Sequence, residues 1–367
     1  MRLESRSSAM AAVTQFLGFL ANSGEGKLLG LASYGDPSRH ADLFERLLRT
    51  TAHGFDVDLS YFAYFMDGPA RYCDRLVAEL GPARRPESAL DKRDEDIAAA
   101  LQARTEEVLL HLCRLAREKT GQDDLCMAGG VALNCVANGR IVDEAGYERC
   151  FFQPACHDAG TSAGAALYAH HVIEGRPRSP LSVKTDYLGP GFDEDRLRLA
   201  LDQSGASFSE PADPAAAVAE RLARGRIVGR YDGRTEFGPR ALGNRSILAP
   251  PGPAEVKDTL NARVKFREPF RPFAPSCTVE RGGDYFAMSQ PSPFMLRAFE
   301  TREAWRDELA AITHVDGSAR VQTVEASHNP GYHAVIKAYG ALSGHECVLN
   351  TSFNVRGEPI VNTPEEA

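Results

Sequence analysis

The stretch "DLCMAGGVALNCVANGRIVDEAG", residues 124–146, predicts a short apolar strand, a Gly-Gly turn and a helix. The stretch "CFFQPACHDAGTSAGAALYAHHVI", residues 150–173, repeats this design of strand, loop and helix. A long helix is expected just before them, over 93–120, because apolar residues recur there at helical spacing. Strand, turn and helix in alternation predict an α/β fold.

The alternation of helices and strands continues on both sides of residues 93–173. Residues 11–35 predict a helical segment, a Gly-rich turn and a second short element, and the second half of the chain adds a helix over 215–225, a strand over 226–233, a helix over 332–342 and a strand over 346–353. Gly and Pro are concentrated over 174–192, which is typical of a linker. We therefore predict two domains, 1–175 and 190–367, joined by a linker over 176–189.

The length, charge and cysteine content of the chain limit the kinds of protein that it could be. A chain of 367 residues is long enough for two cores, and its net charge of −8 argues against a nucleic-acid-binding surface. No apolar run is long enough to span a bilayer, and the first ten residues do not resemble a secretion signal. The eight cysteines form no CxxC pair, which disfavours a cysteine metal site and suits a reducing compartment. These features predict a cytoplasmic enzyme without a membrane or nucleic-acid partner.

The segment 230–271 departs from the acidic balance of the chain. It carries nine basic residues against five acidic ones, and "KFREPFRPFAP" alternates the cations with Phe and Pro. Rigid guanidinium groups suit phosphate oxygens because they bind them through two parallel hydrogen bonds and keep their charge. The alternative is a surface patch of salt bridges. We favour an anion site.

Further polar residues follow predicted strands. Asn350, Ser352 and Asn354 end one strand and Arg320 precedes another, where ligands of α/β sheets gather, although Asn and Ser also serve ordinary turns. Gly129 and Gly130 would let a nucleotide approach the backbone, or would simply form a tight turn. Asp158 could bind a metal ion or cap the following helix.

Seven blocks, taken together and in order, resemble the carbamoyltransferase family that O-carbamoylates antibiotics and nodulation factors. They are "NSGEGKLLGLASYG", "AGGVALNCVANGRI", "QPACHDAGTSAGAA", "GRTEFGPRALGNRSIL", "KFREPFRPFAPS", "HVDGSARVQTV" and "NTSFNVRGEPIVNTPEEA". The resemblance implies part of a sugar-kinase/actin-type ATPase domain, its second lobe, followed by a YrdC-like α/β domain. The YrdC-like domain would activate carbamoyl phosphate with ATP as carbamoyl-adenylate, and the ATPase-type domain would transfer the carbamoyl group to a hydroxyl of a small molecule.

The resemblance also implies site residues. The activation pocket would consist of Arg240, Arg245, Lys265, Arg267, Arg271, Arg320, Asn350, Ser352 and Asn354. In the first half, Gly129, Gly130 and Asn134 would contact nucleotide, Glu25 and Lys27 would lie near its ribose and base, and Asp158 would bind an iron-type metal. The implied cofactors are ATP with Mg²⁺, and Fe²⁺ or a similar metal in the complete transfer domain.

The sequence departs from the family pattern at several points. The family's His-x-x-x-His metal pair is absent, and "APPGP" follows "RSIL" where the family has Asp-Pro. We therefore expect a chain that lacks the first ATPase lobe and a short C-terminal stretch. It would be either a truncated gene product or a chain that needs a separate N-terminal lobe as a partner. Two alternatives remain open: an enzyme of the threonylcarbamoyl-tRNA or hydrogenase-maturation type, and an inactive nucleotide-binding fragment.

Overall fold

The computed structural model describes residues 4–66, 68–178 and 186–367, which form two compact units that divide between Phe152 and Gln153. Both units combine helices with short strands, so the predicted α/β class is confirmed. The predicted domain boundaries stay a prediction. Residues 179–185 of the predicted linker lie outside the described residues.

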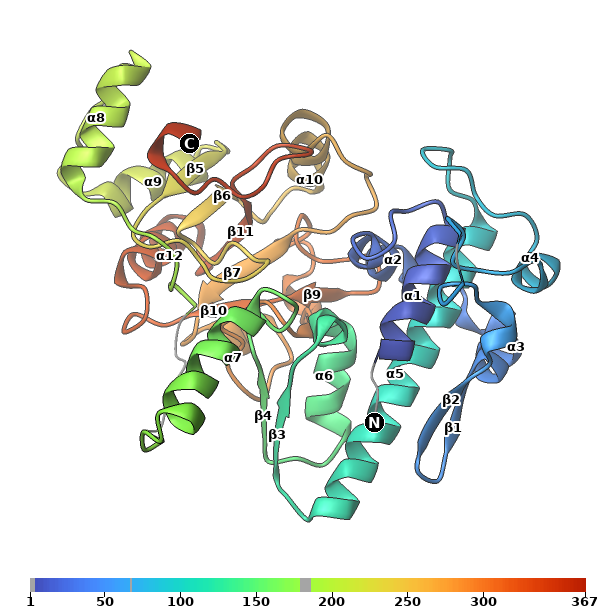
Figure 1. Cartoon of the computed structure of the whole chain (residues 1–367). Coiled ribbons are helices and arrows are strands. Elements are labelled where there is room, and N and C mark those ends of the chain that lie inside the picture. Colours follow the sequence, from blue (N-terminus) through green and yellow to red (C-terminus); the bar gives the residue numbers. More distant parts are fainter. Residues whose placement is uncertain (1–3, 67, 179–185) are drawn as a thin grey trace. The chain divides into compact units, whose positions relative to one another are not determined.

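The first unit is organised around one long helix, α5 (Figure 1). This helix packs against α2, α3, α6 and the β1–β2 hairpin. It begins with a capping box, in which Asp91 accepts from the Asp94 backbone N–H and Asp94 accepts from that of Asp91. It ends at Gly121, whose left-handed φ of 65° suits glycine. The helix predicted over 93–120 is therefore confirmed.

The elements of this unit are α1 (Glu4–Phe16), α2 (Glu25–Ala32), α3 (Ala41–Leu47), β1 (Leu48–Thr51), β2 (Gly54–Val57), α4 (Asp74–Leu80), α5 (Lys92–Thr120), β3 (Asp124–Met127), α6 (Cys135–Glu144) and β4 (Arg149–Phe152), with 3₁₀ turns at Pro37–His40, Leu59–Tyr61 and Gly130–Leu133.

The strand–turn–helix unit predicted over 124–146 is also confirmed. Strands β3 and β4 pair in parallel, and the helix α6 lies between them in sequence. Gly129 has a φ of 102°, which lets the chain turn sharply after β3. Asn134 is the N-cap of α6, because its side chain accepts a hydrogen bond from the Ala137 backbone N–H.

The second unit is built on a five-stranded sheet in the order β10-β7-β11-β6-β5 (Figure 1). Strands β10 and β7 are parallel, and the other neighbours are antiparallel. The helical and strand elements are α7 (Gly160–Tyr168) with a π-helical turn at Ala169–Ile173, α8 (Glu194–Ser204), α9 (Pro214–Ala223), β5 (Val228–Tyr231), β6 (Arg245–Ala249), α10 (Ala254–Leu260) with a π-helical turn at Asn261–Lys265, β7 (Ala274–Thr278), α11 (Gly282–Tyr285), β8 (Ala298–Glu300), β9 (Ser318–Arg320), β10 (Gln322–Val324), α12 (Pro330–Ser343) and β11 (Cys347–Ser352), with 3₁₀ turns at Glu303–Trp305 and Pro364–Glu366.

Both faces of this sheet are buried. Alternate side chains of a strand point to opposite faces, so on β11 Leu349 joins one core cluster and Val348 the other. Helices α9 and α12 contribute to the cluster that contains Val348, while Phe273 and Phe286 belong to the cluster on the opposite face. The sheet is thus a rigid platform, and the carboxyl end of its central strand leads into the polar residues that the sequence singled out.

Among the described residues, we find no helix that combines the length and the apolar character needed to cross a membrane.

Candidate functional site

Lys265 lies against the loop that follows the central strand β11. Its Nζ donates to the Ser352 Oγ at 3.2 Å, to the Asn354 backbone carbonyl at 3.0 Å and to the Asn354 Oδ1 at 2.8 Å, and it also contacts the Ser352 carbonyl. The Ser352 hydroxyl in turn donates to the Asn354 Oδ1 at 2.7 Å. The structure therefore brings together three of the residues predicted for the activation pocket.

Four cationic side chains, which we call the cation cluster, share one region of the second unit. They are Lys265, Arg267, Arg271 and Arg320. Burial, together with the charges of Arg267 and Arg271, lowers the pKa of Lys265 to about 7. Burial, together with the charges of Arg271 and Arg320, lowers the pKa of Arg267 to about 9. Each of these two cations is thus destabilised by its neighbours, and an anion placed among them would relieve that repulsion.

Short-range contacts hold two arginines of the cation cluster, Arg267 and Arg271. Arg267 donates through Nε to the Asn261 Oδ1 at 2.7 Å, and its guanidinium lies 4.3 Å from the centre of the Phe273 ring. Arg271 lies 3.7 Å from the Glu268 carboxylate. Because these contacts hold the side chains in place, little conformational entropy remains to be lost when an anion binds.

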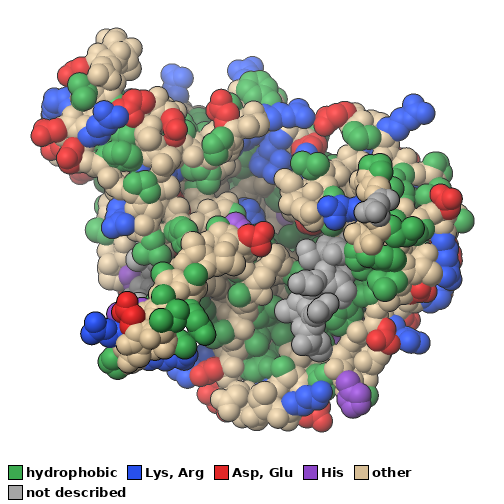
Figure 2. Space-filling view, in the orientation of Figure 1, with side chains coloured by type: hydrophobic (Ala, Val, Ile, Leu, Met, Phe, Trp, Pro, Cys, Tyr) green, Lys and Arg blue, Asp and Glu red, His purple; other side chains and the backbone are tan. Residues whose placement is uncertain are grey.

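The basic residues of this region are not part of a uniformly basic surface. Figure 2 shows blue and red side chains interspersed over the visible face, in keeping with the acidic net charge of −8. Lys265 itself is buried, with 6% of its surface exposed. The predicted anion site is thus a local feature of the second unit.

Asn350 lies inside the sheet beside these groups. Its Nδ2 donates to the Ser276 Oγ at 3.0 Å and to the Gln322 Oε1 at 3.1 Å, and a longer bond of 3.3 Å reaches the Ala241 carbonyl. These contacts tie β11 to β7, to β10 and to the loop that precedes β6. The geometry gives Asn350 a positioning role in the sheet, and its contact with a ligand stays a prediction.

The Arg245 side chain makes its hydrogen bonds within the segment 231–246, to which it belongs. Its guanidinium is fully buried and donates to the backbone carbonyls of Asp232 at 2.7 Å and Gly233 at 3.2 Å. It also stacks on the Tyr231 ring at 3.7 Å. Arg245 therefore stabilises this loop, and its contact with a phosphate stays a prediction.

Two further side chains contribute to the environment of this loop. Glu236 is buried, and its Oε1 accepts from the backbone N–H groups of Leu242 at 2.7 Å and Asn244 at 2.9 Å. Burial raises the pKa of the Cys156 thiol to about 11, and the charge of the nearby Arg240 opposes this rise. The phosphate-binding role predicted for Arg240 is not tested by these contacts.

The nucleotide-binding residues predicted in the first half serve local structure in the first unit. Asn134 donates through Nδ2 to the Gln102 Oε1 at 2.9 Å, in addition to capping α6. Glu25 accepts from the Asn22 backbone N–H at 2.7 Å, and the Lys27 Nζ lies 5.6 Å from the centre of the Phe19 ring. Gly129 and Gly130 are exposed, and a Cβ added to either would meet no atom within 4 Å. A nucleotide therefore has space to approach the backbone at these two glycines. The nucleotide-binding role of all five residues stays a prediction.

Asp158 is exposed and precedes α7, for which Ala159, without a side-chain cap, is the N-cap. The capping alternative is therefore not realised. Within 4–66, 68–178 and 186–367, no three His, Cys, Asp or Glu side chains are grouped so that they could hold a metal ion. The residues described do not fit an iron site by themselves, since structural and catalytic metals usually need three or more protein ligands. Iron binding through Asp158 stays a prediction.

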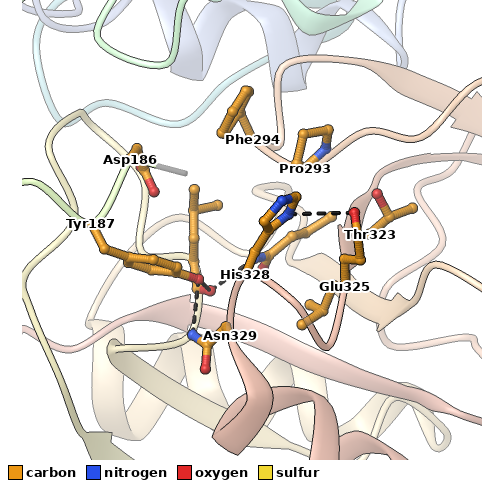
Figure 3. Close-up of a pocket in the computed structure, with 11 residues that line it drawn as sticks. Asp186, Tyr187, Pro293, Phe294, Thr323, Glu325, His328 and Asn329 are labelled. Carbon is orange, nitrogen blue, oxygen red and sulfur yellow. Dashed lines mark hydrogen bonds and ion pairs between the residues drawn. The ribbon is translucent and has the colours of Figure 1, made fainter. Parts of the chain in front are cut away.

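A small pocket in the second unit was not expected from the sequence (Figure 3). Tyr187 donates to the Leu242 carbonyl at 2.8 Å and accepts from the Asn329 Nδ2 at 2.9 Å. Burial and the nearby Glu236 carboxylate raise the pKa of the Asp186 carboxyl well above its usual range. These side chains come from distant segments and follow no motif, so no sequence signal could have indicated the pocket.

The lowered pKa of Lys265 predicts how anion binding depends on pH. A bound polyphosphate favours the protonated amine, so binding takes up a proton once the pH exceeds about 7. We expect the affinity for inorganic tripolyphosphate to fall from pH 7.5 to 8.5 by up to about tenfold, measured by calorimetry. A Lys265→Arg variant keeps its charge and should show a shallower slope. An equal slope in both proteins would contradict this prediction.

Two sequence models of one family match the chain, the carbamoyltransferase N-terminus over residues 5–167 and the carbamoyltransferase C-terminus over residues 219–367. The chain belongs to the carbamoyltransferase family. The resemblance that the seven blocks indicated is thereby confirmed. The cation cluster and the polar end of β11 lie in the region that matches the C-terminal model.

Several known proteins are similar to this carbamoyltransferase-family chain. An uncharacterized protein of Synechocystis sp. is 42% identical over 97% of this chain and 63% of its own length. The nodulation protein NolO of Bradyrhizobium diazoefficiens is 40% identical over 94% of the chain and 62% of its own length. The 3'-hydroxymethylcephem-O-carbamoyltransferase of Amycolatopsis lactamdurans is 35% identical over 92% of the chain and 60% of its own length. The chain thus spans less than two thirds of the length of these relatives.

Proposed function

We propose that this chain is part of an ATP-dependent O-carbamoyltransferase and that its second unit forms carbamoyl-adenylate from ATP and carbamoyl phosphate. The observation that carries the proposal is the cation cluster, in which burial and the charges of neighbouring cations lower the pKa of Lys265 and of Arg267. Repulsion of this kind is costly unless a polyanion binds there. The phosphate groups of ATP and carbamoyl phosphate are such anions.

The proposed reaction uses this charge in a defined way. Carbamoyl phosphate first loses inorganic phosphate to water and gives carbamate. A carbamate oxygen then attacks the α-phosphorus of ATP, and the bond to pyrophosphate breaks. Arg267 and Arg271 would hold phosphate oxygens through paired hydrogen bonds, while Lys265 would neutralise charge that develops on the α-phosphate. Mg²⁺ bound to ATP would neutralise part of the remaining phosphate charge.

The second half-reaction would transfer the carbamoyl group from the adenylate to a hydroxyl of a small molecule and release AMP. The similarity to a 3'-hydroxymethylcephem-O-carbamoyltransferase supports this type of acceptor. On this proposal residues 190–367 have the YrdC-like role, and residues 1–175 belong to the ATPase-type transfer domain.

Pyrophosphate exchange tests the activation step directly. We expect the chain, given ATP, MgCl₂ and carbamoyl phosphate, to incorporate labelled pyrophosphate into ATP, because formation of an adenylate with pyrophosphate is reversible. The reaction without carbamoyl phosphate is the control and should show only background incorporation. A folded protein that binds ATP but exchanges no pyrophosphate would refute the proposed activation step.

A further inference from the structure

Phe266, which lies between two members of the cation cluster in sequence, has an unfavourable backbone conformation. It lies between Lys265 and Arg267, at the end of the π-helical turn that follows α10, with φ 45° and ψ 51°. A bulky side chain in this left-handed region is uncommon and costs free energy, and glycine or asparagine normally occupies such a helix end. Strained positions of this kind concentrate at functional sites.

The fold does not require the ring of Phe266. The backbone N–H donates to the Asn261 carbonyl and the backbone carbonyl accepts from the Arg356 Nη1 at 3.4 Å, and glycine could make both contacts. The ring itself is 53% exposed, so it contributes little to a core. Packing of the half-exposed ring within the second unit therefore offsets the conformational cost of Phe266 only in part.

The loop after β11 brings a second apolar side chain to the same place. Lys265 contacts Asn354, and the Phe266 carbonyl contacts Arg356, so Val355 lies between two points where this loop joins the Lys265–Arg267 segment. Val355 is 44% exposed. In Figure 1 the loop, in red, runs beside α10. Exposed apolar groups thus occur next to the cations of the cluster.

We propose that Phe266 is a nucleobase-binding residue, whose ring stacks on the base of the nucleotide while the neighbouring cations hold its phosphates. This inference rests on the proposed function of the cation cluster. An aromatic ring offers a flat apolar surface that suits any purine, and stacking requires no hydrogen-bonding partner. Val355 contributes apolar contact at the rim of the same site.

The test compares two ligands that differ in the base. ATP and inorganic tripolyphosphate are titrated calorimetrically into the unaltered protein and into the Phe266→Gly and Phe266→Tyr variants. We expect Phe266→Gly to weaken ATP binding about 5- to 150-fold and to leave tripolyphosphate binding unchanged. Phe266→Tyr keeps the ring and should bind both ligands as before.

A stability measurement separates this role from a structural one. Because glycine relieves the left-handed strain, we expect Phe266→Gly to raise the Tm by about 2–4 °C while ATP affinity falls. Equal weakening of ATP and tripolyphosphate, or unchanged ATP affinity, would overturn the stacking role alone. Failure of the unaltered protein to bind either ligand would overturn the proposed function, and the stacking role with it.

Discussion

A Gly243→Ala variant should lose roughly 3 kcal/mol or more of its free energy of unfolding. Gly243 has a φ of 121°, where a Cβ is strained whatever the space around it. A Cβ at this position would also lie 2.7 Å from the Tyr332 Cε1 and 2.8 Å from its Cγ. Tyr332 belongs to α12 and is completely buried in the core cluster on that face of the sheet, so it has no space to move away. Strain and overlap act together, so the effect should exceed that of an ordinary core substitution.

Thermal unfolding measures this effect, with Gly283→Ala as the matched control. Gly283 lies in helix α11 of the same unit, and a Cβ added there would meet no atom within 4 Å. We expect Gly283→Ala to leave the Tm within about 2 °C of the unaltered protein, and Gly243→Ala to lower it by about 6–12 °C. Similar Tm values for the two variants would show that the packing of Gly243 on Tyr332 is not tight.

An Arg267→Gln variant should lose about 100-fold or more of the carbamoyl-phosphate-dependent pyrophosphate exchange. Arg267 is the central member of the cation cluster, because its charge acts on Lys265 and it is itself affected by Arg271 and Arg320. Glutamine keeps a polar side chain near Asn261 but provides neither the charge nor the paired donors. The variant should therefore bind the phosphate groups of its substrates more weakly and should stabilise the charge that develops on the α-phosphate less well.

Arg224→Gln is the control for this loss of charge. Arg224 caps helix α9 in the same unit, is exposed and pairs with Glu220 at 3.2 Å. We expect this variant to exchange pyrophosphate at the rate of the unaltered protein. If Arg267→Gln also did so while remaining folded, the cation cluster would have no part in the activation step.

The sequence predicted local elements well, because local patterns determine them. The apolar periodicity of α5, its capping residues and the terminal Gly121 are all close in sequence, and the helix forms as expected. Helix α6 is likewise determined by residues close in sequence, since Gly129 lies in the turn before it and Asn134 is its N-cap. The residue blocks also indicated the family, which the two family matches confirm.

The role of individual arginines could not be predicted in the same way. Arg245 and Arg267 lie in equally basic, proline-rich stretches, and both donate to backbone carbonyls. Besides burial, the charges of Arg271 and Arg320 nevertheless lower the pKa of Arg267, whereas the carboxylates of Glu236 and Asp232 act on Arg245. Whether a guanidinium comes close to a second cation depends on how the chain packs, since Arg320 is more than fifty residues beyond Arg267. Sequence spacing contains no information on that contact.

What the sequence determined by itself is the α/β class, the family and the concentration of cations between 230 and 271. Only the tertiary structure decided which of these cations share a site, because Lys265 is held by Ser352 and Asn354, which lie more than eighty residues further along the chain. The pocket at Tyr187 and Asn329 and the burial of Arg245 depend on the same long-range packing. Burial and charge interact through space, so their effects on pKa and binding appear only once the sheet has brought these segments together.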